Sequence, residues 1–557
     1  MNPDVQARLE RYKSTPIDGQ MLKKLVEAGL TWLRANQQTV NLLNVFPVPD
    51  GDTGTNMVLT MQSAYKEIDT LGHHGVGQMA AAVSQGALMG ARGNSGVILS
   101  QLWRGFARAL HNQETLDGPS LVRALAEGRD TAYKGVVRPV EGTILTVAKD
   151  VAAAAQEALR ETNDPYEILA RIVPAANASV ERTPDLLPVL KQAGVVDSGG
   201  KGLFFILEGM VRYILGEPLD APVATVQPLS AMNLENAVED IEPGQDFEVV
   251  VDFVPDQELD LRTFYTELET MGTSNQVGEG EVMYRMHIHV PTENRNKPAD
   301  YIMGLGTITK IAMENLIAQM EDIRKKSSGG HIELANIEPG QIAVVTVSPG
   351  RGISRVFASL GVAGIVEGGQ TMNPSIKDIL DAFENLPTDK IIILPNNKNI
   401  ILAAQQAKDV TVKNVHIIPS RTVPQGLAAM MQHNPDGNLE AVVARMTKSI
   451  EDVITIEITT ATRTVEIDGV SVEQGQVIAL VNGSLAVSTV SVELACLGGL
   501  EKAGTAGCEL ITLFYGEDMP INEANRIVDV IRAAYPAQEV ELQDGGQPHY
   551  QFILSVE

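Results

Sequence analysis

Apolar residues in the first part of the chain recur every three or four positions, which is the spacing of an amphipathic helix. Asp18 can cap the first of these segments, because a short acidic side chain accepts bonds from free helix N–H groups. No alternating strand pattern interrupts the series. We therefore predict an all-α domain over residues 1–216, with further helices near 56–68, 76–89, 97–110, 119–132, 144–160, 166–180 and 202–214.

The pattern changes after residue 216. Residues 217–244 are rich in proline and acidic residues and predict a linker. A stretch containing serine and glycine at 323–340 predicts a second linker. Between them, residues 245–322 predict a small α+β domain, with strands at Phe247–Phe253 and Val282–Val290 and helices at Leu259–Met271 and Ala299–Ala318.

Residues 341–557 predict an α/β domain, because short apolar strands alternate with helical segments. Such alternation implies parallel strands with helices on the sheet faces. The dipeptides Asp468-Gly469 and Asn482-Gly483 are hairpin signals and add antiparallel strands. The predicted strands are 342–347, 364–366, 390–394, 415–418, 509–515, 538–543 and 549–556, and the predicted helices lie near 352–360, 375–385, 397–408, 424–431, 491–503 and 521–534.

Charge and composition narrow the class of protein. The 557 residues carry a formal net charge of −27, which argues against a nucleic-acid partner and against adsorption to anionic membranes. No apolar run reaches the roughly 20 residues that span a bilayer, and the N-terminus lacks the apolar core of a signal peptide. We expect a soluble, cytoplasmic protein without an integral membrane segment.

A dense polar cluster, Asp50-Gly-Asp52-Thr-Gly-Thr-Asn56, stands directly before an apolar-periodic helix. A helix N-terminus suits phosphate, since it carries unpaired N–H groups and partial positive charge. Two carboxylates would repel that phosphate unless a cation lay between them, and Mg²⁺ prefers such a mixture of carboxylates, phosphates and water. The cluster predicts a magnesium–nucleotide site. The alternative, which the Asp-Gly-Asp tripeptide alone favours, is an ordinary turn that caps the helix.

Three further Gly-containing polar loops open helices in the same domain: Gly90–Gly96, Arg138–Thr143 and Val195–Gly202. Each alone is explained by a turn and a cap. An up-and-down bundle places alternate loops at one end, so the four loops can converge on one nucleotide. Neither a Walker P-loop nor a kinase catalytic-loop signature is present.

The segments Asn44–Met57, Gly90–Gly96 and Asp197–Gly200 resemble the nucleotide-binding domain of the dihydroxyacetone kinase family. The chain as a whole resembles the ATP-binding catalytic subunits of bacterial fatty acid kinases. That resemblance implies an antiparallel eight-helix barrel that binds ATP with two Mg²⁺ ions. Distinctive matches that say less about chemistry lie at Glu367–Ser375, Leu394–Asn399 and Ile418–Gly426.

The resemblance also assigns site residues. Asp50 and Asp52 would be the Mg²⁺ ligands, with Asn44 as a further candidate, and Thr53 would join the two aspartates as a catalytic residue. Gly54, Thr55 and Asn56 would contact phosphates or metal. The phosphates would be held by Gly93, Asn94, Ser95 and Gly96, and the nucleoside side by Thr143, Asp197, Ser198 and Gly199.

The implied substrate is a fatty acid delivered by a separate DegV-like fatty-acid-binding protein that docks on residues 341–557, and the implied product is an acyl phosphate. The implied assembly is a homodimer. A fatty carboxylate is already ionised at pH 7, so positioning and charge neutralisation by Mg²⁺ should dominate. Arg92 and Arg138 are both open as the neutralising cation. Two alternatives remain: an ADP-binding subunit of a dihydroxyacetone-type phosphotransferase, and a non-enzymatic lipid-carrier scaffold.

His287 and His289 form a separate candidate, because residues two apart on a strand face the same side. They can be zinc ligands or the polar face of a half-buried strand. In related kinases a similar pair forms a zinc site completed by a cysteine on the preceding strand. Val250 occupies that place here, so zinc is left open, with Asp252 or water as the substitute ligand.

Overall fold

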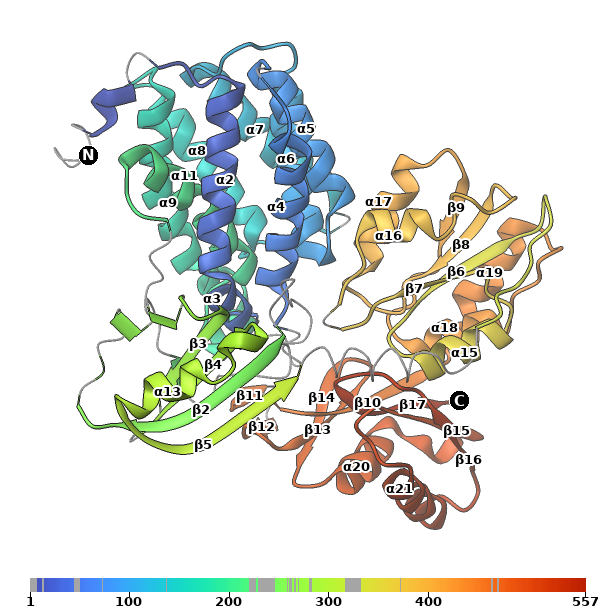
Figure 1. The fold of residues 1–557 in the computed structure, drawn as a ribbon. Coiled ribbons are helices and arrows are strands. Elements are labelled where there is room, and N and C mark those ends of the chain that lie inside the picture. The colour runs from blue at the N-terminus through green and yellow to red at the C-terminus, as the bar shows by residue number, and fades with distance from the viewer. Residues whose placement is uncertain are drawn as a thin grey trace. The chain divides into compact units, whose positions relative to one another are not determined.

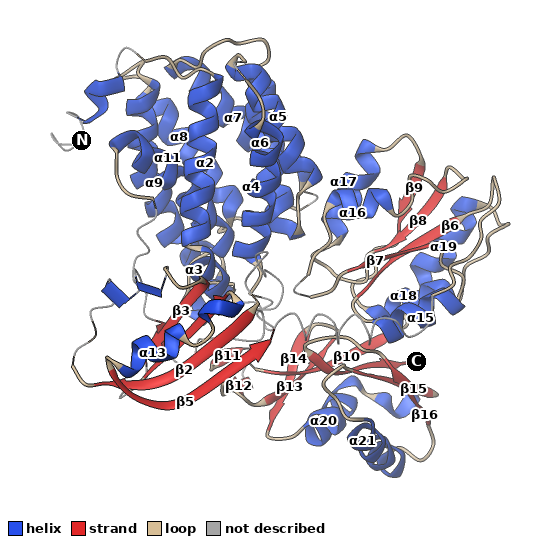
Figure 2. Ribbon diagram, in the orientation of Figure 1, coloured by secondary structure: helices blue, strands red, loops and turns tan. Residues whose placement is uncertain are grey.

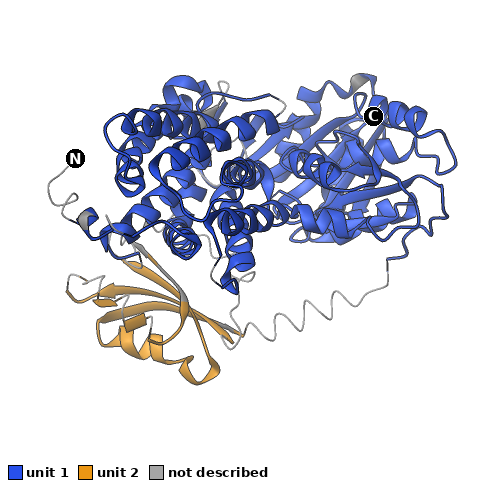
Figure 3. Cartoon of the chain, turned by 90° about the horizontal axis from the view of Figure 1, so that it is seen from above, with its two compact units in different colours: residues 1–220, 332–557 blue, residues 221–331 orange. Residues whose placement is uncertain are grey.

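The computed structural model describes most of the chain, in two compact units (Figure 3). One unit combines residues 1–220 with 332–557, and the other is Ala221–His331. The predicted domain boundaries at 216 and 341 stay predictions. Within the described residues no helix is both long and apolar enough to cross a bilayer. The described ranges are 8–12, 15–44, 51–72, 74–136, 138–219, 227–228, 246–257, 259, 263–264, 267–268, 270–279, 283–315, 332–370, 372–461, 464–467 and 470–557.

The first part of the chain is helical throughout its described residues, as predicted (Figures 1 and 2). The Asp18 carboxylate accepts a bond of 2.8 Å from the backbone nitrogen of Met21, which confirms the predicted cap. Buried side chains from successive helices, among them Leu33, Met61 and Val147, form one apolar core. An eight-helix barrel is a finer statement and stays a prediction. The helices are α2 (Gly19–Ala35), α3 (Gln37–Leu42), α4 (Thr53–Asp69), α5 (Val76–Met89), α6 (Gly93–Ala109), α7 (Gly118–Gly135), α8 (Ile144–Ala158), α9 (Pro165–Leu186), α10 (Pro188–Ala193) and α11 (Ser198–Leu215).

The unit Ala221–His331 contains a five-stranded sheet in the order β1-β3-β4-β2-β5. Its described core includes Val249, Phe253 and Ile288. Of the predicted helix Leu259–Met271 the structure describes only part, and residues 263–264 and 267–268 are helical. The elements are β1 (Gln227–Pro228), β2 (Phe247–Pro255), β3 (Thr273–Glu279), β4 (Tyr284–Val290), η4 (Thr292–Asn294), α13 (Lys297–Met303) and β5 (Gly306–Asn315).

The predicted helix Ala299–Ala318 is wrong. The helix α13 ends at Met303, and Gly306–Asn315 is the strand β5. Glycines at 304 and 306 interrupt the helical pattern, and the β-branched residues that follow suit an extended chain. The strand β5 then finds hydrogen-bond partners along the whole of β2, with which it pairs antiparallel.

The C-terminal part begins with a four-stranded parallel sheet in the order β7-β6-β8-β9, as predicted. Val345 and Ile393 face the core shared with α16 and α17, whereas Val344 and Ile392 face the core shared with α15, α18 and α19. The strands are therefore buried on both faces. The elements are β6 (Ala343–Ser348), α15 (Arg351–Ser359), β7 (Gly364–Glu367), α16 (Ile376–Asp381), β8 (Lys390–Leu394), α17 (Ile401–Val410), β9 (Asn414–Ile417), α18 (Val423–Met430) and α19 (Leu439–Ser449).

A six-stranded sheet follows, in the order β14-β13-β10-β17-β15-β16. Asn482 and Gly483 both have positive φ, at 50° and 80°, and form the predicted hairpin turn between β13 and β14. Asp468-Gly469 lies outside the described residues, but the strands on either side of it pair antiparallel. The elements are β10 (Ile454–Thr460), β11 (Val465–Ile467), β12 (Val470–Val472), β13 (Val477–Val481), β14 (Ser484–Thr489), α20 (Val492–Ala503), β15 (Leu510–Tyr515), α21 (Ile521–Ala534), β16 (Glu539–Asp544) and β17 (Tyr550–Val556).

The parallel sheet and the helical part share an apolar contact within their common unit. Ala91 and Val97, at the start of α6, belong to the same buried cluster as Ile376 of α16 and Ala403 of α17. The amide nitrogen of Gln101 donates a buried bond of 2.8 Å to the side chain of Gln406. This contact brings the loop that follows β7 to the N-terminal ends of α4 and α6.

Candidate nucleotide and metal site

The first turn of α4 is capped by a side chain from another helix. The Asn41 Oδ1 atom accepts bonds from the backbone nitrogens of Gly54, at 2.7 Å, and Thr55, at 3.2 Å. Asp52, which stands at the N-cap position, makes no cap bond with its side chain. A capped turn built on the side chain of this buried aspartate is thereby excluded.

Gly54 allows α3 and the start of α4 to approach this closely. A Cβ atom at that position would lie 2.4 Å from the carbonyl oxygen of Gln37 and 2.8 Å from Asn41 Oδ1. The Thr55 hydroxyl accepts bonds from Gln37 and Asn41, at 3.0 and 3.1 Å, so it faces α3.

The N-terminus of α6 has no side-chain cap, because Arg92 at the N-cap position offers only donors. Gly93 follows with a φ of +56°, a conformation that favours glycine. A Cβ atom on Gly93 would lie 2.7 Å from Asn56 Nδ2, so this loop lies directly against the start of α4. Asn94 is exposed and Ser95 half-buried. The first-turn N–H groups of α6 are therefore available to an anion.

The loops before α8 and α11 join the same end of the helical part. Ser198 Oγ lies 3.3 Å from Thr53 Oγ1, and a Cβ atom on Gly199 would lie 3.4 Å from Ile144 Cβ. The structure thus brings together four predicted loops, around residues 51–56, 92–96, 142–144 and 197–199. Of the cluster's two aspartates, Asp50 lies outside the described residues.

Thr143 and Asp197 each act as a cap for their own helix. The Thr143 hydroxyl donates to the carbonyl of Val140, at 2.7 Å, and accepts from the backbone nitrogen of Leu145, at 3.4 Å. Asp197 Oδ2 accepts a bond of 2.6 Å from the backbone nitrogen of Gly200. Burial raises the pKa of Asp197 to about 6. Their predicted contacts with the nucleoside stay predictions, since local bonds already explain both side chains.

Two residues at this site were not predicted from the sequence. One is the cap Asn41, and the other is Asn373, whose side chain is 1 % exposed. Asn373 Nδ2 donates a short hydrogen bond to Asp52 Oδ2. The Glu367–Ser375 match marked this segment as distinctive, but nothing local tied it to a residue 321 positions earlier in the chain.

The two arginines considered as neutralising cations differ in their surroundings. Arg92 Nη1 donates a bond of 2.9 Å to the carbonyl of Asn373, and its Nη2 lies 3.4 Å from Asp378 Oδ2. Arg138 is exposed. Arg92 therefore binds the neighbouring segment of the C-terminal part. Asn44 follows α3, and its backbone nitrogen bonds the Asn41 carbonyl at 3.1 Å.

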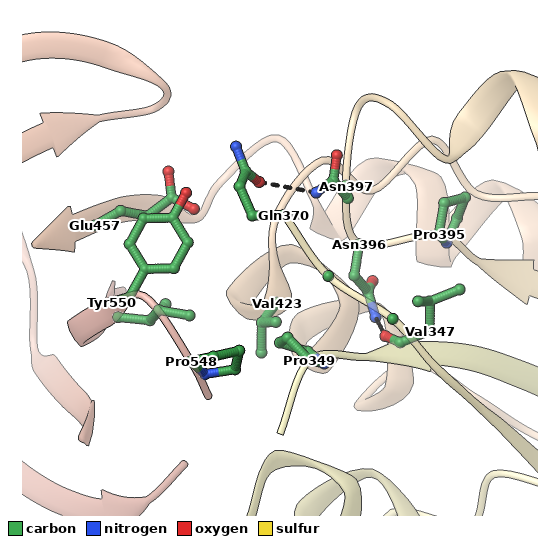
Figure 4. A pocket seen from close by; sticks show the side chains of 13 residues that line it. Val347, Pro349, Gln370, Pro395, Asn396, Asn397, Val423, Glu457, Pro548 and Tyr550 are labelled. Carbon is green, nitrogen blue, oxygen red and sulfur yellow. Dashed lines mark hydrogen bonds between the residues drawn. The ribbon is translucent and has the colours of Figure 1, made fainter. Parts of the chain in front are cut away.

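A small cavity of about 30 Å³ lies at the carboxyl ends of the parallel strands (Figure 4). Gly368, Gly369 and Gln370 line it, and Gln370 accepts a bond of 2.8 Å from Asn397. Glu457 of β10 also lines it, and burial raises the pKa of that carboxyl to about 7. The sequence did not predict this cavity.

The histidine pair lies in a buried cluster with a carboxylate. One ligand atom each from Glu248, His287 and His289 lie within 4.8 Å of one another, and His287 Nε2 is 2.8 Å from Glu248 Oε1. Both ring nitrogens of His289 are buried, and neither has a hydrogen-bond partner in the described part of this unit. Burial lowers the pKa of His289, which favours the neutral form that binds metals.

The expectation that Asp252 could serve as the third zinc ligand needs to be corrected. Its carboxylate binds Arg285 through two bonds of 2.6 and 2.7 Å. Glu248 takes that place, because it lies two residues before Val250 on the same face of β2 and pairs in register with His289. Three such donors fit a zinc ion.

Two families match the chain. Residues 47–212 match the DAK2 domain, and residues 343–557 match the FakA-like C-terminal domain of fatty acid kinases. The protein YloV of Bacillus subtilis (strain 168) is 39 % identical over 551 residues, which cover 97 % of this chain and 99 % of that protein. An uncharacterized protein of Staphylococcus aureus (strain USA300) is 38 % identical over 549 residues, with coverage of 97 % and 99 %.

Solved structures with partial likeness fall into two groups. Dihydroxyacetone kinase from C. freundii, in complex with AMP-PNP and Mg²⁺, is 21 % identical with a TM-score of 0.27, and the match covers 36 % of this chain and 35 % of that one. The Streptococcus pneumoniae fatty acid kinase B3 protein, loaded with linoleic acid, is 17 % identical with a TM-score of 0.26, and the match covers 33 % and 76 %.

Proposed function

Because the chain belongs to the FakA-like family of fatty acid kinase proteins, we propose that it transfers the γ-phosphoryl group of ATP to a fatty acid, with Mg²⁺. A carboxylate oxygen of the fatty acid forms a bond to the γ-phosphorus, and the bond from that phosphorus to the β,γ-bridging oxygen breaks. The products are an acyl phosphate and ADP. The acceptor is presented by a separate fatty-acid-binding protein.

One observation carries the proposal: the buried Asp52 carboxylate stands at the N-cap position of α4 but makes no cap bond there. Asn41 caps α4 in its place, and the uncapped first turn of α6 lies alongside. A carboxylate beside free helix N–H groups suits a hydrated cation and the phosphates that the cation binds. Asp52 would hold Mg²⁺ together with Asp50, and the ion would neutralise charge on the transferring phosphoryl group.

The reaction asks little else of the side chains. A fatty acid is ionised at neutral pH, so the acceptor oxygen needs no general base. The four loops contain no histidine. The chain's contribution is then to hold ATP through the first turn of α6 and to keep Asp52 in a fixed orientation.

A turnover assay tests the proposal with the full chain, ATP, Mg²⁺, a fatty acid and the fatty-acid-binding protein, omitting each in turn. Asp52→Ala should lower acyl phosphate formation by at least ~1000-fold, because charge neutralisation by a metal is worth several kcal/mol. Asp52→Asn, the matched variant of equal size, should fail as well. A variant that still made acyl phosphate at the unaltered rate would refute the proposal.

Label from ATP distinguishes the two alternatives. Labelled γ-phosphate should appear in the acyl phosphate when free ATP is supplied. A phosphotransferase subunit that retains ADP as a bound cofactor would not transfer that label. A scaffold would bind no Mg–ATP, which calorimetry measures directly.

We further propose that Glu248, His287 and His289 bind one zinc ion. The orphaned ring nitrogens of His289 support this, because buried imidazole nitrogens normally have partners. Metal analysis of the purified chain should find one zinc per chain, and His289→Ala should lose it. Zinc retained by that variant would contradict the assignment.

A further inference from the structure

We propose that Asn373, from the C-terminal part, completes the metal site of the helical part. Its amide nitrogen positions the Asp52 carboxylate, and its amide oxygen accepts a hydrogen bond from a water of the hydrated cation. The inference rests on the proposed function, because it takes Asp52 as a metal ligand.

The first support is the way in which Asn373 is held. Its side chain is buried and donates to Asp52 Oδ2, while its backbone carbonyl accepts the Arg92 guanidinium at 2.9 Å. The backbones of Arg92 and Ser375 form an isolated antiparallel bridge, and the backbone nitrogen of Ile376 bonds the carbonyl of Ala91 at 3.3 Å. The segment is therefore anchored at Asn373 itself and at the two residues Ser375 and Ile376 that follow it.

The second support is an unpaired acceptor. Asn373 Oδ1 is buried and has no hydrogen-bond partner among the described residues. Buried polar atoms are satisfied in the great majority of cases, so this oxygen points to a donor outside the described part of the chain. Beside a carboxylate that holds Mg²⁺, the suitable donor is one of the several waters that the ion keeps.

The third support is the distance to the phosphate loop. A Cβ atom on Gly93 would lie 3.5 Å from Asn373 Nδ2. The amide thus lies next to Asp52 on one side and next to the first turn of α6 on the other. That is where a cation shared between a carboxylate and a phosphate has its remaining waters.

The arrangement explains how two parts of the chain act on one reaction. The loop after β7 provides Asn373, and the apolar contact of α16 and α17 with α5 and α6 keeps that loop in place. The helical part alone lacks the amide that donates to Asp52 Oδ2. Docking of the C-terminal part therefore sets the metal affinity of the helical part.

The test compares Asn373→Ala and Asn373→Leu with Gln406→Ala, all in the full chain. Gln406 belongs to the same internal contact but bonds Gln101 rather than Asp52, so its variant controls for a loosened contact. The leucine variant keeps the side-chain volume and guards against simple loss of packing. Calorimetry measures ATP binding as a function of Mg²⁺ concentration, and circular dichroism checks folding.

Both Asn373 variants should need at least ~10-fold more Mg²⁺ for half-maximal ATP binding, because hydrogen bonds to charged groups are the strong ones. Gln406→Ala should match the unaltered chain. An unchanged Mg²⁺ requirement in the Asn373 variants would overturn the inference, and a lower requirement would show that the amide competes with the cation instead. If the unaltered chain binds Mg–ATP but forms no acyl phosphate, the proposed function fails while this comparison still decides the role of Asn373.

Discussion

Replacement of Asn41 by alanine should open the first turn of α4, whereas replacement of Asp52 by alanine should not. Asn41 Oδ1 accepts two backbone bonds, at 2.7 and 3.2 Å, and Asp52 accepts none of the cap bonds. Each bond is worth roughly 0.5–1.5 kcal/mol net, so two bonds sum to about 1–3 kcal/mol. We take the lower part, about 1–2 kcal/mol, because loss of a whole helix cap costs no more than about 2 kcal/mol.

Loss of the cap opens only the first turn of α4. A measurement at that turn therefore suits it better than the melting temperature of the whole multidomain chain. A loss of about 1–2 kcal/mol multiplies the population of the opened turn by about 5–30. Hydrogen–deuterium exchange of the peptide that contains Gly54 and Thr55, without Mg²⁺ or nucleotide, should speed up by that factor in Asn41→Ala.

The comparison variant gives the result that would refute the reasoning. Asp52→Ala, which removes any capping oxygen at this position, should exchange in this turn at the rate of the unaltered chain. If Asp52→Ala opened the turn and Asn41→Ala did not, Asp52 would be the cap. The carboxylate would then have an ordinary structural role, and the proposed metal site would lose the observation that carries it.

Three further predictions concern other positions. Gly93→Ala should weaken Mg–ATP binding about tenfold, as measured by calorimetry. The positive φ costs an alanine roughly 1–2 kcal/mol, and the added Cβ atom would displace the Asn56 side chain. Unchanged affinity for Mg–ATP would contradict this prediction. Burial raises the pKa of Asp197 from 3.8 to about 6, so between these values the folded chain keeps a proton that the unfolded chain loses. The free energy of unfolding should therefore fall as the pH rises from about 4 to about 6. Asp197→Asn, which caps equally well, should lack this fall in denaturant midpoints, and parallel pH profiles would refute the assignment. Glu248→Gln should lower the zinc content measured by metal analysis more than the exposed Glu440→Gln does, and equal contents would exclude the carboxylate as a ligand.

Periodicity predicted the elements well where one face of each element meets a core. The predicted helix 76–89 matches α5 residue for residue, because its buried positions repeat at the helical period. The predicted strand 390–394 matches β8 residue for residue, because a short continuous apolar run is typical of a strand buried on both faces. The strand β5 was missed because its sequence suits either state, and pairing with β2 decides between them. Tertiary partners, rather than local sequence, set such segments.

The candidate site was also predicted only as far as local sequence determines its structure. Glycines before helices indicated loops that the structure brings to one end of the helical part, since each glycine serves a local turn or a close approach. Asn41, Asn373 and Glu248 were missed because each acts on a residue of another element, through helix packing, the contact of α16 with α5, or strand register. Single-sequence spacing carries no information on such pairs.

The segment after β7 contacts two separate places, the cavity and the Asp52 carboxylate. Gly368, Gly369 and Gln370 line the cavity of Figure 4, and Asn373, three residues further on, holds Asp52. A molecule in the cavity and a cation on Asp52, as proposed above, would therefore both act on one short stretch of backbone. By thermodynamic reciprocity, a molecule that changes the affinity for Mg–ATP through this stretch has its own affinity changed by Mg–ATP by the same factor.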